Sequence, residues 1–235
     1  MDHSAGRTYS KEHLKRSIAV ILLVLLADQV LKVWVKLNFF YESSVSILGT
    51  KGYLHFIENP GMAFGMVFGG ERGKLLLTLF RIIAVIAIGY SLWRMSKQGA
   101  RTGLLISVAL IFAGALGNII DSTFYGLIFS QSTPYQKAIL FPPEGGYGSL
   151  FHGSVVDMFY FPLWQGHFPQ WFPFWGGRSF EFFEPVFNVA DAAITVGVVL
   201  FILTQRKGKE ADAVEAGPMR TETSEVGPAA QGAVI

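Results

Sequence analysis

Four apolar stretches, each about as long as a bilayer is thick when helical, determine what this chain can fold into. They cover residues 17–37, 75–93, 103–120 and 186–204. A helix rises about 1.5 Å per residue, so about 20 apolar residues cross the roughly 30 Å hydrocarbon core of a membrane. Only 15% of the 235 residues are charged and 51% are hydrophobic, unlike a water-soluble domain. The sequence therefore predicts an all-α membrane protein with four transmembrane helices.

The composition also excludes several functional classes. The chain has no Cys, which excludes disulfides, a thiol nucleophile and Cys-ligated metals. Its five His are widely separated, so no metal or other cofactor is expected. The net charge of +2 is too small for a nucleic-acid binder.

The distribution of Lys and Arg predicts the orientation. The first apolar stretch follows basic residues, as a signal peptide would, but it continues without a small-residue cleavage site and is predicted to be a retained helix. Basic residues also flank the second, third and fourth stretches on one side of the membrane, at residues 94–101 and 206–209. The positive-inside rule therefore places residues 1–16 and the polar tail 205–235, predicted to be disordered, in the cytoplasm.

The two long connections, residues 38–74 and 121–185, then face outward. Residues 45–68 mix β-branched and aromatic residues with glycines, which predicts short strands and turns. Residues 159–183 contain 12 aromatic residues in 25, a density that suits the headgroup layer. We expect aromatic-rich outer loops rather than simple linkers.

Polar residues in or beside the apolar stretches are the candidate functional groups, because burying an ionisable side chain in a membrane is costly. Two Asn-x-x-Asp motifs stand out, at the end of the third stretch and the start of the fourth. Spacing of three residues puts the amide and the carboxyl group on one helix face, near the outer end of the span. The set comprises Asp28, Asn59, Asn118, Asp121, Asp157, Asn188 and Asp191.

Taken singly, most of these residues also allow a structural interpretation. Asp28 can pair with Lys32 four residues later on the same helix. Asp121 can be a solvated residue at a helix end, and Asn59 can form a turn before Pro60. Asp157 can be a loop residue bonded to backbone amides.

Five motifs occur in one order along the chain, and together they are specific. They are Asp28-Gln-Val-Leu-Lys32, Glu58-Asn-Pro-Gly-Met-Ala-Phe64, Gly114-Ala-Leu-Gly-Asn-Ile-Ile-Asp121, Val155-Val-Asp157 and Phe187-Asn-Val-Ala-Asp191. This arrangement resembles the signal peptidase II family of bacterial aspartic proteases, over about residues 15–205.

The resemblance implies four transmembrane helices with a small extracytoplasmic β-cradle. It implies a monomeric inner-membrane enzyme that removes the signal peptide from prolipoproteins, cleaving just before a diacylglyceryl-modified Cys. The catalytic dyad of the family falls on Asp157 and Asp191. Asn59, Asn118, Asp121 and Asn188 match polar residues that line its active site, and Asp28 matches its acidic residue in the first helix.

The chain departs from the family pattern in two places. Ser122 stands where the family usually has Arg, and Arg178 or Lys137 are candidates to replace that cation. Residues 124–150 form an apparent insertion between the motifs that contain Asp121 and Asp157.

Two other functions remain open from the residues alone. A proton-coupled transporter would use Asp28, Asp121 and Asp191 as a relay, and would need ionisable residues across the membrane. A scaffold protein would use the acidic residues for helix packing, and their loss would then lower expression rather than turnover.

Overall fold

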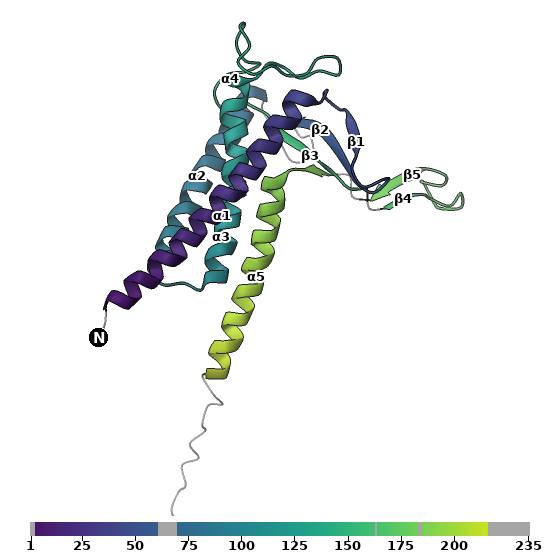
Figure 1. Ribbon diagram of the computed structural model, residues 1–235. Helices are drawn as coiled ribbons and strands as arrows, with labels where there is room; N and C mark the ends of the chain where they lie inside the picture. The colour runs from purple at the N-terminus through teal and green to yellow at the C-terminus, as the bar shows by residue number, and fades with distance from the viewer. Residues whose placement is uncertain (1–2, 61–69, 163, 183–184, 216–235) are drawn as a thin grey trace, which may run out of the picture.

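The computed structural model describes residues 3–60, 70–162, 164–182 and 185–215. Long helices run side by side, and a small β-sheet lies at one end of them (Figure 1). The start of α1 and the end of α5 both lie at the opposite end of the bundle (Figure 1).

Three of the long helices contain segments long and apolar enough to cross a membrane. The helices are α1 (His3–Asn38), α2 (Gly70–Lys97), α3 (Thr102–Ile120) and α5 (Val189–Glu215). The spanning segments are Glu12–Asn38, Arg72–Lys97 and Thr102–Ile128. The fourth apolar segment, Val189–Gln205, is a shorter helix. The predicted apolar helices are thus present, with three of full spanning length among the described residues.

The outward faces of these helices are apolar, as expected for surfaces that contact lipid. Large hydrophobic side chains on α1, α2 and α5 are about half to two-thirds exposed: Leu22, Leu23, Leu26, Leu76, Phe80, Ile83, Val196 and Val199. A water-soluble protein rarely exposes so large a contiguous apolar surface.

The helix ends differ from the sequence-based boundaries. Helix α1 begins before residue 17, within the predicted N-terminal segment, and α2 extends beyond residues 75–93 at both ends. The third helix does not end at Ile120: it continues as a π-helix, η2 (Asp121–Tyr125), and a short turn, α4 (Gly126–Ile128), because the following residues are also buried. The predicted outer loop therefore begins with helical turns. Residues 186–188 precede the last helix, and that helix extends to Glu215, so residues 205–215 are helical. Residues 216–235 of the predicted disordered tail lie outside the described residues.

The outer connections form a small antiparallel sheet. Its strands are β1 (Ser44–Ser46), β2 (Tyr53–Asn59), β3 (Val155–Tyr160) and β6 (Val186–Phe187), in the order β1-β2-β3-β6. A separate hairpin of β4 (Trp164–His167) and β5 (Ser179–Phe182) extends away from the bundle within the aromatic stretch (Figure 1). The short strands predicted for residues 45–68 are present in the described part of that segment.

A hydrophobic core joins the sheet to the end of the helices. Phe56 of β2 and Met158 of β3 are fully buried against Val35 of α1. Tyr125 and Phe129, which follow α3, complete this core. The core fixes β3, which carries Asp157, on the end of the bundle.

Close contact between α3 and α5 depends on glycine. A Cβ atom at Gly114 would overlap the carbonyl oxygen of Ala190 and lie 2.7 Å from Cγ1 of Ile194. A Cβ atom at Gly117 would lie 2.8 Å from the Oδ2 atom of Asp28. These glycines let the start of α5 approach α3 closely.

Gly114→Ala should therefore destabilise the protein, because backbone rather than a flexible side chain occupies the space of the new methyl group. Overpacking of this kind costs about 1–3 kcal/mol. Thermal unfolding in detergent should show a lower midpoint for Gly114→Ala than for the control Ala115→Val, which adds more volume at a half-buried neighbour. Equal midpoints for Gly114→Ala and the wild type would contradict the close contact.

Candidate active site

The start of α5 holds Asp191 through a reciprocal cap. The Oδ1 atom of Asn188 accepts a hydrogen bond from the backbone N–H of Asp191 at 2.9 Å. The Oδ2 atom of Asp191 accepts one from the backbone N–H of Asn188 at 3.3 Å. This is the arrangement of a capping box, in which residues three apart satisfy each other's free N–H groups. The Asn-x-x-Asp spacing thus both begins the helix and orients the carboxylate.

Asn188 also reaches the second candidate acid, Asp157 of β3. Its Nδ2 atom donates to Oδ1 of Asp157 at 2.7 Å, and the Asn188 side chain is fully buried. Asn59 at the end of β2 is a further hydrogen-bond partner of Asp157. In the register of β2 and β3, Asn59 pairs with Val155, so it lies diagonally from Asp157 on the same face of the sheet.

A second amide holds Asp191 from α3. The Nδ2 atom of Asn118 donates to Oδ1 of Asp191 at 2.8 Å. The Oδ1 atom of Asn118 accepts from Nζ of Lys32 at 2.8 Å and from Nδ2 of Asn188 at 3.2 Å. Asp157 and Asp191 therefore both accept hydrogen bonds from Asn188, Asp157 from its side-chain amide and Asp191 from its backbone N–H.

The electrostatic setting of Asp157 favours its protonated form. Burial and the nearby charge of Asp191 raise the pKa of Asp157 to about 7, against the opposing effect of the hydrogen bonds from Asn188 and Asn59. Its side chain is only 5% exposed. A carboxyl group that holds a proton near neutral pH beside a second carboxyl group is the setting of an acid–base pair.

A buried ion cluster lies directly beneath the two acids. Nζ of Lys32 on α1 lies 2.9 Å from Oδ2 of Asp28 and 2.8 Å from Oδ2 of Asp121, and all three side chains have no exposed surface. Nε2 of Gln29 donates to both carboxylates, and the hydroxyl of Tyr125 donates to Oε1 of Gln29. Each carboxylate of the cluster is therefore paired and hydrogen-bonded, as burial requires.

The ion cluster is tied to both elements that carry the candidate acids. Oδ1 of Asp28 accepts from the backbone N–H of Ala190, next to Asp191, at 2.9 Å. Oδ2 of Asp121 accepts from the backbone N–H of Val156, next to Asp157, at 3.3 Å. The cluster thus positions the backbone on both sides of the site.

One further cation faces the candidate acids. The charge of Arg81, on α2, interacts electrostatically with both Asp191 and Asp157. The sequence alone did not distinguish Arg81 from a snorkelling Arg, whose guanidinium group reaches the membrane surface.

The structure brings all seven predicted site residues together and corrects three structural interpretations. Asn59 ends a strand rather than forming a turn, and Asp157 lies within β3 rather than in a loop. Asp121 is fully buried and ion-paired, not solvated. Asp28 does pair with Lys32, as its i,i+4 spacing allowed.

Lys32, Gln29 and Tyr125 are the site neighbours that the sequence analysis did not select. The signal for Lys32 was available, since a Lys within an apolar stretch needs an acidic partner. For Tyr125 no signal existed, because it follows a helix end that the sequence placed too early.

Ser122, which replaces the Arg expected from the motif pattern, is buried. Its hydroxyl donates to the backbone oxygen of Asn118 at 3.0 Å. The candidate replacement Lys137 lies over the ring of Phe40. Neither Lys137 nor Arg178 makes a hydrogen bond or ion pair with a site residue in the described ranges, and Lys32 is the cation that pairs with Asp121.

The fold is shared with solved bacterial membrane enzymes. Two such structures, determined by the in meso method at 2.3 Å and 1.9 Å resolution, match with TM-scores of 0.53 and 0.52. They share 22% and 23% sequence identity with this chain and cover 83% and 81% of it, over 90% and 92% of their own lengths. The bundle with its antiparallel sheet is thus a fold that this chain shares with those two structures.

The chain belongs to the signal peptidase II family, whose model, described as signal peptidase (SPase) II, matches residues 20–206. Its relatives include a lipoprotein signal peptidase of Porphyromonas gingivalis, 50% identical over 186 residues, or 79% of this chain and 80% of the relative. The lipoprotein signal peptidase of Amoebophilus asiaticus is 40% identical over 190 residues, or 80% and 76% of the two chains. The resemblance expected from the five motifs is confirmed.

Proposed function

We propose that this chain is an aspartic endopeptidase that removes signal peptides from diacylglyceryl-modified prolipoproteins, with Asp157 and Asp191 as its catalytic pair. The observation that carries the proposal is the convergence of these two carboxyl groups on Asn188, from a strand and a helix far apart in sequence. Membership of a lipoprotein signal peptidase family supplies the substrate class.

The pair acts by sharing a proton. Two neighbouring carboxyl groups in a low-dielectric site do not both ionise, so one holds a proton while the other is a base. The ionised carboxylate takes a proton from a water molecule as that water attacks the scissile carbonyl. The protonated carboxyl group donates a hydrogen bond to the carbonyl oxygen, and the pair titrates as a unit.

The neutral amides suit this chemistry. Asn188 donates to Asp157 and Asn118 donates to Asp191, so both carboxyl groups are oriented without an added positive charge in direct contact. Lys32 acts on Asp191 through Asn118. Its ammonium group donates to the side-chain oxygen Oδ1 of Asn118, and this fixes the side-chain Nδ2 group of Asn118 toward Asp191.

We place the site at the outer surface of a bacterial inner membrane, with both termini in the cytoplasm and the enzyme active as a monomer. The sheet end of the bundle then faces outward, and the ends of the described chain face the cytoplasm (Figure 1). Each buried methylene of a diacylglyceryl chain contributes about 0.8 kcal/mol, so the lipidated Cys stays in the bilayer. A site at this depth meets the cleavage position without extracting the lipid.

The proposal is tested with purified enzyme and a synthetic prolipoprotein peptide bearing diacylglyceryl-Cys. Mass spectrometry should identify one cut, immediately before the lipidated Cys. The same peptide with an unmodified Cys is the control and should be cut far more slowly. Cleavage at other bonds, or no dependence on the lipid, would contradict the proposed activity.

The raised pKa of Asp157 predicts the pH dependence of the reaction. The active pair holds one proton, and that proton is lost as the pH rises through the Asp157 pKa of about 7. The kcat/KM value should therefore fall about tenfold per pH unit above this value. A profile of kcat/KM against pH checks this, and an unchanged rate up to about pH 9 would contradict a shared proton.

A further inference from the structure

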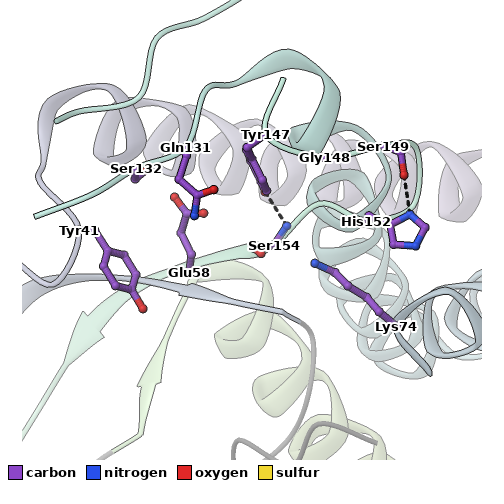
Figure 2. A pocket seen from close by; sticks show the side chains of 10 residues that line it. All are labelled: Tyr41, Glu58, Lys74, Gln131, Ser132, Tyr147, Gly148, Ser149, His152 and Ser154. Carbon is purple, nitrogen blue, oxygen red and sulfur yellow. Dashed lines mark hydrogen bonds between the residues drawn. The ribbon is translucent and has the colours of Figure 1, made fainter. Parts of the chain in front are cut away.

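A polar pocket lies beside the proposed active site, on the inserted segment. It has a volume of about 440 Å³. Its lining consists only of polar residues and one glycine: Tyr41, Glu58, Lys74, Gln131, Ser132, Tyr147, Gly148, Ser149, His152 and Ser154 (Figure 2). Half of these belong to residues 124–150, the insertion relative to the family pattern. Such a lining suits neither an acyl chain nor the apolar part of a signal peptide.

The acidic residue of the pocket is already neutralised. Oε1 of Glu58 lies 2.5 Å from Nζ of Lys36, a buried side chain of α1. The same ammonium group donates to Ser132 at 3.2 Å and lies 4.9 Å from the ring centre of Tyr147. Glu58 and Lys36 therefore contribute no net charge to the pocket.

Lys74 brings a second positive charge to the pocket, and the described carboxylate whose charge acts on it is Glu58, which already pairs with Lys36. The half-buried side chain of Lys74 makes no ion pair or hydrogen bond with any described residue. Figure 2 shows its ammonium group directed into the pocket. A bound anion would compensate the positive charge of Lys74.

Neutral polar groups line the pocket together with Lys74. The hydroxyl oxygen of Tyr147 accepts from the backbone N–H of Ser154 at 2.7 Å, which fixes the phenol in the pocket wall (Figure 2). Burial raises the pKa of Tyr147 to about 12, which keeps its hydroxyl protonated at neutral pH. The pocket thus combines a cation with neutral polar groups.

Lys74 lies within the length of a few peptide residues from Arg81, whose charge acts on the candidate acids. Lys74 precedes Arg81 by seven residues, or two helical turns, so both lie on one face of α2, roughly 10 Å apart along its axis. Lys74 is nearer the sheet end, which is the outer end in the proposed topology. An extended peptide advances about 3.3 Å per residue, so about three residues cover this distance.

We propose that this pocket binds an acidic side chain in the segment of the substrate that follows the lipidated Cys, with Lys74 as its main ligand. The inference rests on the proposed function, and it adds a preference for Asp or Glu at one of the second to fifth residues of the mature lipoprotein. That segment leaves the site toward the aqueous side and passes the pocket.

The test compares lipidated peptides that carry Asp or Asn at one of these positions, in a neutral detergent. Wild-type enzyme should show a KM about tenfold lower for the Asp peptide at one or more positions, with kcat nearly unchanged, as expected when one charge pair is added. Lys74→Gln should abolish the difference and Lys74→Arg should retain most of it. Lys51→Gln, which changes an exposed Lys of the β1–β2 turn, is the matched control.

Equal KM values for Asp and Asn peptides at all four positions, or a preference that survives Lys74→Gln, would overturn the inference. Activation by added phosphatidylglycerol that depends on Lys74, without any peptide preference, would assign the pocket to a lipid headgroup and also overturn it. Cleavage of the Asn peptides keeps the proposed peptidase activity intact in either case. Failure to cleave any lipidated peptide would instead contradict the proposed function.

Discussion

Asp157→Asn and Asp191→Asn should each lower kcat by about 10²–10⁴-fold, because each removes one partner of the shared proton. Asn is nearly the same size and can keep hydrogen bonds to the neighbouring amides. Each variant also removes a carboxyl group from a largely enclosed site, so the protein should unfold at the wild-type temperature or slightly above it. Rates are measured on the lipidated peptide, and folding is followed by thermal unfolding in detergent.

The control for these variants is Glu144→Gln, which neutralises an exposed carboxylate of the insertion. It should leave both the rate and the unfolding temperature unchanged. If the acidic residues instead served only helix packing, the Asn variants would express poorly while the folded fraction kept its turnover. That outcome would favour a scaffold over an enzyme.

Lys32→Met should destabilise the protein by about 3–5 kcal/mol, because it leaves the carboxylates of Asp28 and Asp121 buried without a cation. All three side chains lack exposed surface, so water does not replace the lost partner. Chemical or thermal unfolding of the purified protein measures the loss.

Two comparisons make this prediction specific. Lys15→Met removes a cation from an exposed pair with Glu12, whose side chains are 72% and 54% exposed, and should cost at most about 1 kcal/mol. The triple variant Lys32→Met, Asp28→Asn, Asp121→Asn removes the unpaired charges and should recover most of the stability. If the triple variant were as unstable as Lys32→Met alone, unpaired charge would not be the cause.

The membrane fold and the candidate acids were predictable because both leave strong local signals. A run of about twenty apolar residues rarely forms anything but a membrane-spanning helix. A carboxylate such as Asp191 among alanines and valines is costly to bury, which marks it as a candidate functional group. The Asn-x-x-Asp spacing placed amide and acid on one helix face, and the capping geometry of Asn188 and Asp191 follows from it.

The sequence could not predict contacts that depend on how distant elements meet. Asp157 was expected in a loop because a strand of six residues gives little period-two signal, and its position in β3 depends on pairing with β2. The end of α3 was placed too early, because Asp121 looked like a solvated end until Lys32 of another helix paired with it. Arg81 and the pocket around Lys74 became visible only when α2, the sheet and the insertion were assembled.

The central claim is that Asp157 and Asp191 share one proton near neutral pH, and an infrared titration of the purified enzyme tests it most directly. Difference spectra of wild type against Asp157→Asn, recorded between about pH 5 and about pH 9, should show a protonated carboxyl band that disappears with a midpoint near the Asp157 pKa of about 7. The absence of that band throughout this range, with both carboxyl groups ionised in an active enzyme, would contradict the account.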